Sequence, residues 1–166
     1  MITKKELDIL YKWASVKEFI VKKTPWSVGY ANKNVLVCGL KFVRKKTHIQ
    51  KNLMPDEICE IIKNDDIIHA SYCEFTSKTK LNPHKDPDIY GEKYKRIHIP
   101  LFIPDKNECY MEWTETKNDI INWEEGKPIV CDVMNRVHQV FNNSNRSMKF
   151  LFLDVKIDVE VELWRT

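Results

Sequence analysis

The sequence lacks a hydrophobic run long enough to cross a membrane, and residues 1–10 lack the apolar core of a signal peptide. It also lacks a C-x-x-C pair. Its five cysteines are odd in number and lie far apart in the sequence. This spacing argues against both a disulfide framework and a structural zinc site. We therefore expect a cytoplasmic protein without a membrane segment, whose cysteines are small buried residues in a reducing compartment.

Internal repeats, low-complexity segments and a convincing linker are missing too. The 166 residues, 43% hydrophobic and 31% charged, suffice for one globular domain with a sizeable core and leave no room for a second domain of ordinary size. We predict a single domain, in which residues 1–66 form a helical and mixed N-terminal support and residues 67–166 form the β-sheet core.

Positive charge is concentrated in the N-terminal third. Residues 1–50 contain eleven Lys and Arg against three Asp and Glu, whereas residues 51–166 contain sixteen against twenty-one. Such asymmetry permits an acidic partner or a nucleic acid near the N-terminal half. The densest stretch, KFVRKKTHIQK at residues 41–51, has few aromatic residues and no recognisable nucleic-acid module. A solvated basic surface is therefore the main interpretation, and a nucleic acid is not an expected partner.

Two helices are predicted in the N-terminal part. Thr3, followed three residues later by Glu6, forms the pattern of a capping box, and apolar residues at helical spacing come after it. A second helix is expected to begin near Pro55, since two acidic residues follow this proline. Between the two helices, residues 34–43 have the composition of a strand.

From residue 67 onward, short runs rich in β-branched and aromatic residues alternate with turn-forming clusters. The runs are IIHASYCEF, RIHIPLFI, CYMEWTE, PIVCDV, HQVF and KFLFLDVKIDVEVELW. Several short strands without intervening helices indicate an antiparallel sandwich or barrel. The two N-terminal helices would then cover one of its sheets.

Strand alternation brings particular polar residues together. Arg96 and His98 are two positions apart in one predicted strand and therefore share a face, opposite Ile97. By the same argument His138 shares a face with Val140 in another strand. The predicted interior thus contains polar side chains, as a barrel with an internal site requires.

The stretch LNPHKDPDIY contains His84 and Asp86, a pair that chance alone could easily supply. Together with His138, however, the two residues complete a set of two imidazoles and one carboxylate. This is the ligand set of non-haem Fe(II) oxygenases, in which the remaining metal positions stay open for a co-substrate and O₂. We therefore predict that His84, Asp86 and His138 bind iron and are the catalytic residues.

An oxygenase of this kind needs a source of electrons, and 2-oxoglutarate is a common one. Its distal carboxylate needs a fixed cation inside the barrel, and the planar fork of arginine suits this best. Arg146 lies eight residues after His138, far enough to enter the next strand. Arg96 and His98 offer a second polar pair.

The residues from about Ser71 to Asp154 resemble the aspartyl/asparaginyl β-hydroxylase family of 2-oxoglutarate-dependent oxygenases. The motifs that carry this resemblance, in order, are PHKD (83–86), RIHIPL (96–101), WEEGK (123–127), Asp132, HQVFNNS (138–144), Arg146 and LD (153–154). The resemblance implies a mainly β, double-stranded β-helix fold, a cupin-like jelly roll, with the N-terminal helices packed on one sheet. It also implies that His84 and His138 bind iron, and that Arg146, with Arg96 and His98 nearby, binds 2-oxoglutarate.

The sequence departs from the family pattern at some positions. Some animal members have glycine at the carboxylate position, whereas this chain has Asp86, so a complete triad is expected here. The loop of residues 85–95 is longer than the common form, and Asp132 lies farther from His138 than the usual acidic residue. Neither difference involves a predicted iron ligand, but both could reshape the opening through which substrate enters.

The leading hypothesis is an Fe(II)- and 2-oxoglutarate-dependent dioxygenase that hydroxylates an Asp or Asn side chain in a peptide or protein. A hydroxylase of a free amino acid such as proline is the nearest alternative, and a metal-binding or ligand-binding jelly roll without turnover is a rival. We interpret Trp123 and Gly126 as structural, and Asp132 and Asp154 as residues that stabilise turns or orient Arg and His side chains. His48 and His69 match no motif and are treated as ordinary residues.

Overall fold

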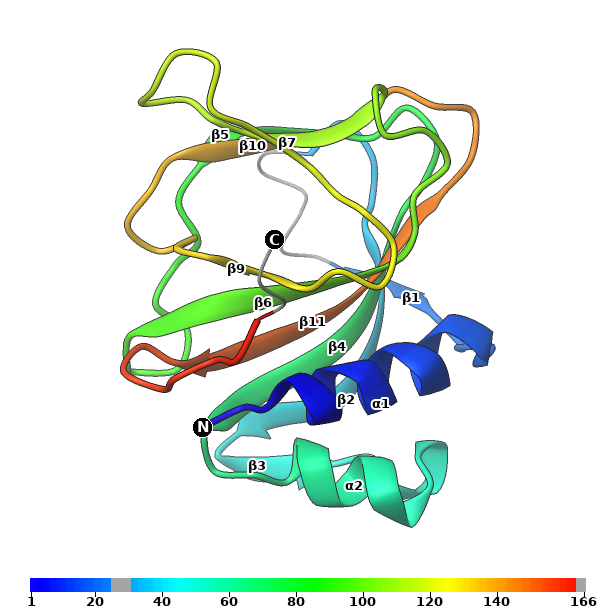
Figure 1. The fold of residues 1–166 in the computed structure, drawn as a ribbon, viewed down its shortest axis with the longest axis vertical. Coiled ribbons are helices and arrows are strands. Elements are labelled where there is room, and N and C mark those ends of the chain that lie inside the picture. Colours follow the sequence, from blue (N-terminus) through cyan, green and yellow to red (C-terminus); the bar gives the residue numbers. More distant parts are fainter. Residues whose placement is uncertain (25–30, 164–166) are drawn as a thin grey trace.

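Two β-sheets face each other, and two helices cover the outer face of the larger sheet (Figure 1). The computed structural model describes residues 1–24 and 31–163. The helical elements are α1 (Lys4–Val16), the short 3-10 helix η2 (Lys51–Leu53) and α2 (Asp56–Ile62). The strands are β1 (Lys22–Lys23), β2 (Leu36–Arg44), β3 (Lys46–Ile49), β4 (Ile67–Phe75), β5 (Lys80–His84), β6 (Tyr94–Phe102), β7 (Cys109–Trp113), β8 (Ile120–Asn122), β9 (Ile129–Cys131), β10 (His138–Asn142) and β11 (Met148–Lys156).

The strand order is that of two sheets built from segments distant in the sequence. The larger sheet has the order β1-β2-β4-β11-β6-β9, with β3 paired to β2, and the smaller has the order β5-β10-β7-β8. Every ladder between these strands is antiparallel. The predicted jelly roll is therefore confirmed. Strand β2 pairs with β4, so the N-terminal part supplies strands to the same sheet as the core, while the single-domain boundaries stay a prediction.

Both predicted helices form where the sequence indicated. The hydroxyl of Thr3 accepts a hydrogen bond from the Glu6 backbone N–H (3.2 Å), and the Glu6 carboxylate accepts one from the Thr3 N–H (2.7 Å). This reciprocal pair is the predicted capping box and satisfies two donors that the first turn would otherwise leave unbonded. Helix α1 then buries Leu7, Leu10 and Ala14 against the larger sheet.

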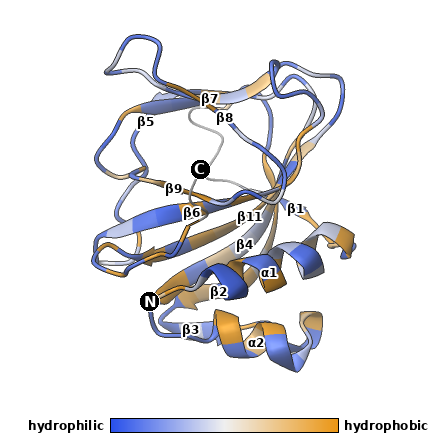
Figure 2. Cartoon of the chain, viewed as in Figure 1, coloured by the Kyte–Doolittle hydropathy of each residue, from blue (hydrophilic) through white to orange (hydrophobic). Residues whose placement is uncertain are grey.

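The core is divided into two layers by the larger sheet. On strand β6, Ile97 and Ile99 are fully buried toward the helices, whereas His98 lies between the two sheets. Phe150 and Phe152 of β11 also occupy the space between the sheets. The predicted separation of polar and apolar faces on β6 is thus confirmed. Figure 2 shows hydrophobic residues along β4 and β11 and hydrophilic ones in the outer loops.

Some elements differ from the sequence-based expectation. The basic stretch at residues 41–51 is not only a charged surface, because it forms the hairpin of β2 and β3 with Lys45 in its turn at a φ of 59°. The last apolar run ends its strand at Lys156, and after a turn Val161 pairs with Ile2 in an isolated bridge. Among the described helices, none has the length and apolar character needed to cross a bilayer.

The loop that precedes β9 packs closely on helix α1, and substitutions at Gly126 and Gly91 test this contact. Gly126 and Gly91 both have positive φ angles, 73° and 75°. A Cβ at position 126 would lie 3.1 Å from the Tyr11 ring, whereas a Cβ at position 91 would meet nothing within 4 Å. Gly91→Ala should cost about 1 kcal/mol of unfolding free energy for the left-handed backbone, and Gly126→Ala about 2–4 kcal/mol because overpacking is added. Urea denaturation of both variants measures the difference in unfolding free energy. Equal decreases in the two variants would show that the Tyr11 ring moves aside without destabilising the protein.

Candidate metal centre

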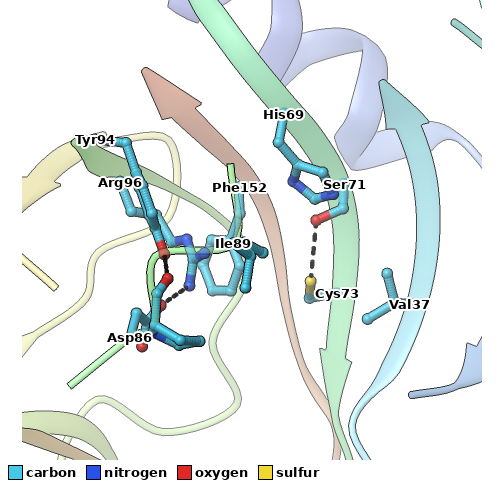
Figure 3. A pocket seen from close by; sticks show the side chains of 10 residues that line it. Val37, His69, Ser71, Cys73, Asp86, Ile89, Tyr94, Arg96 and Phe152 are labelled. Atoms are coloured by element: carbon cyan, nitrogen blue, oxygen red, sulfur yellow. Dashed lines mark hydrogen bonds and ion pairs between the residues drawn. The ribbon is translucent and has the colours of Figure 1, made fainter. Parts of the chain in front are cut away.

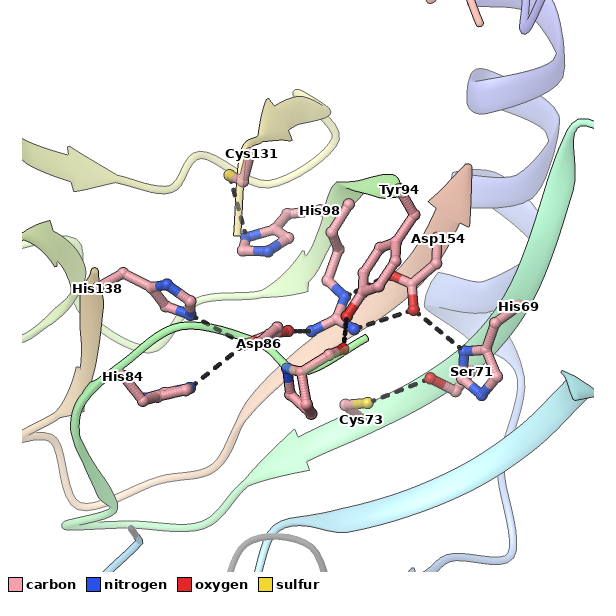
Figure 4. Close-up of polar contacts among 12 residues, drawn as sticks. His69, Ser71, Cys73, His84, Asp86, Tyr94, His98, Cys131, His138 and Asp154 are labelled. Carbon is pink, nitrogen blue, oxygen red and sulfur yellow. Dashed lines mark hydrogen bonds and ion pairs between the residues drawn. The ribbon is translucent and has the colours of Figure 1, made fainter. Parts of the chain in front are cut away.

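The predicted iron ligands come from two neighbouring strands of the smaller sheet. His84 ends β5 and His138 begins β10, and the antiparallel register places the two residues directly opposite each other. Their ring centroids are 4.5 Å apart. Asp86 follows β5 by two residues, and its backbone N–H donates to the Val133 carbonyl (2.9 Å). This bond turns the chain so that the Asp86 side chain lies beside both imidazoles (Figure 4).

The three side chains offer their ligand atoms to one point. Asp86 Oδ1 lies 3.4 Å from His84 Nε2 and 3.3 Å from His138 Nε2, and all three atoms lie within 4.8 Å of one another. Ligands bound about 2.1 Å from one metal at right angles would lie about 3.0 Å apart. Only a small adjustment separates these atoms from that geometry, so the donor set fits a divalent transition metal.

Backbone contacts set the orientation of both imidazoles. Nδ1 of His84 lies 2.6 Å from the carbonyl oxygen of Asn82, and Nδ1 of His138 lies 3.1 Å from that of Arg136. A carbonyl can only accept, so each Nδ1 carries the proton and donates it. In the neutral ring the lone pair is then on Nε2, the atom that faces Asp86. Such contacts are typical of metal-binding histidines.

A buried arginine connects Asp86 to a second carboxylate. Arg96 Nη1 donates to Asp86 Oδ2 (2.5 Å), while its Nε and Nη2 donate to the two oxygens of Asp154 (2.6 and 3.0 Å). Asp154 is fully buried and also accepts from the Tyr90 hydroxyl (2.7 Å). His69 completes the network, with Nδ1 3.8 Å from Asp154 (Figure 4).

The network keeps Asp86 ionised. Burial alone would raise the pKa of Asp86, but the positive charge of Arg96, together with the neighbouring imidazoles of His138 and His84, outweighs it and holds this pKa well below its ordinary value. Burial, together with the nearby charge of Asp154, raises the pKa of Tyr90, so its hydroxyl stays protonated and donates to Asp154. A carboxylate with one oxygen free for a metal is therefore present at neutral pH.

His98 lies next to this network but belongs to a more apolar environment. Its Nδ1 accepts from the Trp123 Nε1–H (3.2 Å), and its ring packs on Phe152 with centroids 4.6 Å apart. Burial holds the pKa of His98 well below its ordinary value, and the charge of Arg96 lowers it further. His98 is thus a neutral imidazole. Figure 4 shows its ring between Cys131 and Asp86.

A cavity of about 200 Å³ opens beside Asp86, and we call it the metal-side cavity. Figure 3 shows Asp86, Tyr94 and Arg96 on one side of it and residues of β4 on the other. Its wall is mainly apolar, with a few polar groups near Asp86, which is the usual character of a small-ligand site. Its lining residues are Val37, His69, Ser71, Cys73, Asp86, Pro87, Ile89, Tyr94, Arg96 and Phe152.

The structure brings together five of the six predicted site residues, namely His84, Asp86, His138, Arg96 and His98. It places Arg146 elsewhere. The Arg146 guanidinium lies 4.6 Å from the centre of the Phe102 ring, at the end of β11 opposite to Asp154. Strand β11 begins at Met148, and its extended chain from Met148 to Asp154 alone spans about 20 Å. The role of Arg146 in cofactor binding stays a prediction.

Sequence reasoning missed the contribution of β4. His69, treated as an ordinary residue, lines the metal-side cavity with Ser71 and Cys73. The signal was present, because polar or small residues at positions 69, 71 and 73 alternate with apolar neighbours and so share one face. The interpretation of Asp154 as a residue that orients Arg and His side chains is confirmed by its contacts with Arg96 and His69.

Solved structures with the same fold are similar over most of the chain. A 2OG-Fe(II) oxygenase family oxidoreductase from Burkholderia pseudomallei aligns with a TM-score of 0.66 and 10% identity, over 95% of this chain and 82% of that one. A prolyl-4-hydroxylase from Pseudomonas putida aligns with a TM-score of 0.58 and 7% identity, over 92% and 86% of the two chains. A cupin-like protein from Thermotoga maritima gives 0.50 and 10%, over 84% and 83%. At these identities the similarity establishes the jelly-roll fold alone.

The sequence itself identifies the family. No curated protein sequence matches the chain. The family model for aspartyl/asparaginyl beta-hydroxylase, however, matches residues 24–157, which is most of the chain and includes every predicted site residue. The protein therefore belongs to the aspartyl/asparaginyl β-hydroxylase family and is a hydroxylase of that family.

Proposed function

We propose that the protein is an Fe(II)- and 2-oxoglutarate-dependent dioxygenase with iron held by His84, Asp86 and His138. The observation that carries this proposal is the convergence of two imidazole Nε2 atoms and one carboxylate oxygen at a single point beside a cavity. Two histidines and one carboxylate on one side of a metal suit Fe(II) and leave its other positions open. Iron and 2-oxoglutarate would supply the oxidising power to hydroxylate an unactivated carbon with O₂, giving succinate and CO₂ as co-products.

The protein's own residues position the reacting groups. Arg96 and Asp154 hold Asp86 in one orientation, with Oδ1 free for the metal. Arg96 makes three of its possible hydrogen bonds to carboxylates, so further N–H groups are available for an anionic co-substrate. His98 is neutral and accepts from Trp123 at Nδ1, so its Nε2 carries the proton and can donate to an anion. We therefore assign recognition of 2-oxoglutarate to Arg96 and His98, while Arg146 enters only through the resemblance in sequence.

The proposed reaction is hydroxylation of the β-carbon of an Asp or Asn side chain in a peptide or protein. This follows from the family, and hydroxylation of a free amino acid such as proline is the alternative. The metal-side cavity of about 200 Å³ has room for a side chain or a small molecule beside the triad. Its volume alone is compatible with both substrates.

Removal of either imidazole tests the metal centre. His84→Ala and His138→Ala should each lose iron and abolish succinate formation, because one imidazole and one carboxylate form a weaker ligand pair for Fe(II) than two imidazoles. The measurement is iron content after anaerobic loading with Fe(II), followed by succinate release with 2-oxoglutarate and O₂. His48→Ala, on β3 and outside the metal centre, is the control and should keep both. Normal turnover by His138→Ala would show that the triad is wrong.

Asp86→Gly tests whether this chain needs its carboxylate, since some members of the family have glycine at this position. Iron should bind at least about tenfold more weakly, because a ligand is lost and the remaining carboxylate, Asp154, offsets only the charge of Arg96 and none of the metal's. Equilibrium iron binding under anaerobic conditions measures this independently of turnover. Asp88→Gly, an exposed acidic residue two positions away, is the matched control. Unchanged iron affinity in Asp86→Gly would indicate a two-histidine centre.

Variants of the two candidate cofactor residues separate the structural and sequence-based assignments. His98→Ala should raise the KM for 2-oxoglutarate about tenfold, because it removes a hydrogen-bonding group next to Asp86. Arg146→Ala should change that KM by less than about twofold, since its guanidinium packs on Phe102 at the other end of β11. Succinate formation at varied 2-oxoglutarate concentration gives both values. The reverse order of effects would assign the distal carboxylate to Arg146.

A further inference from the structure

A second cavity adjoins the metal-side cavity. It has a volume of about 560 Å³ and lies along the edge of the larger sheet, near β1, β2 and η2, and we call it the outer groove. Val37 and His69 line both cavities. The His69 side chain is 24% exposed and faces Asp154 on one side, so it stands at the junction between the groove and the metal centre. The groove therefore lies next to the metal-side cavity, with Val37 and His69 at the boundary between the two.

The outer groove has an uncompensated positive charge. Lys22 and Arg44 line it, and none of the residues that line it is acidic. Neither of these two cations forms an ion pair with any residue in the described ranges 1–24 and 31–163. The surrounding segment, residues 17–51, contains nine Lys and Arg and one acidic residue, Glu18. Such a surface attracts a negatively charged partner.

The apolar part of the outer groove favours a polypeptide over a nucleic acid. Ile20 and Val43 line it and are 84% and 46% exposed, which offers surface to the side chains of a bound peptide. Its aromatic ring, Phe42, is already covered, with the His48 ring stacked at 5.3 Å and the Arg44 guanidinium at 5.5 Å. Single-stranded nucleic acids are usually bound by open aromatic faces on which bases stack, whereas the Phe42 ring already packs against two neighbours of its own chain.

We propose that the substrate is an acidic segment of a polypeptide, which places its target side chain in the metal-side cavity and its flanking residues in the outer groove. Acidic residues next to the target would pair with Lys22 and Arg44. A free amino acid would fill only the metal-side cavity and would make none of these contacts. This inference rests on the proposed hydroxylation and specifies its substrate class.

Charge reversal in the outer groove tests the inference. The probes are fluorescent peptides with a central Asn flanked by Glu or, in the matched peptide, by Lys. The iron-loaded protein should bind the Glu-flanked peptide at least about tenfold more tightly, and this preference should weaken with added salt. The double variant Lys22→Glu/Arg44→Glu should lose or reverse the preference. Lys106→Glu/Lys117→Glu, which makes the same charge change in exposed loops next to the smaller sheet, should keep it.

The outcomes separate this inference from the proposed hydroxylation. Binding of the Glu-flanked peptide by Lys22→Glu/Arg44→Glu as tightly as by the unmodified protein would overturn it, provided that the variant retains iron. Tighter binding of a DNA or RNA oligonucleotide than of the acidic peptide would also overturn it. Succinate formation with free amino acids but no peptide binding would reject the groove and keep the hydroxylase. Charge-dependent peptide binding without succinate from any substrate would reject the hydroxylation instead.

Discussion

A buried guanidinium shared by two carboxylates is the interaction on which the rest of the site depends. Arg96 joins Asp86, which lies in a loop after the smaller sheet, to Asp154 on the larger sheet. The positive charge of Arg96 keeps Asp86 ionised at this depth, and the two carboxylates in turn stabilise the buried cation. The same contacts orient the one oxygen of Asp86 that faces the two imidazoles. The proposed metal centre and the packing of the two sheets are therefore coupled through Arg96.

Those parts of the fold that follow from alternation could be predicted from the sequence. The position of Arg96 and His98 on one face of β6 follows from the two-residue period of side chains, which the backbone imposes wherever a strand forms. The hairpin of β2 and β3 was missed, because its second strand is a run of charged residues whose pairing depends on a turn at Lys45 with positive φ. The backbone preferences of lysine disfavour a positive φ, so the turn at Lys45 could not be predicted from the residue type and depends on the tertiary structure.

The position of a site residue could be predicted where the residue lies on one of two paired strands. It was harder to predict where the conformation of a loop sets the direction of the side chain. His84 and His138 are opposite each other because β5 and β10 pair, an arrangement that the jelly-roll topology supplies. Arg146 differs, because its side-chain direction depends on the turn after β10, which is set by the contacts of the buried Asn142 amide. Spacing from His138 alone could not reveal that Arg146 reaches Phe102 instead of the triad.

Charge balance explains why this arrangement suits an anionic co-substrate. Asp86 and Asp154 with Arg96 carry a net charge of about −1 when all are ionised, and His98 stays neutral because it is buried. A divalent cation on the triad would reverse the sign of the local charge, and the free N–H groups of Arg96 would then face an anion at the same edge of the cavity. Without the Asp86 carboxylate, less of the positive charge of Arg96 would be offset, so Arg96 would attract such an anion more strongly. The metal would at the same time have one ligand fewer. A carboxylate at position 86 therefore strengthens metal binding and weakens anion binding. This difference in binding distinguishes a three-ligand centre from the two-histidine form of the family.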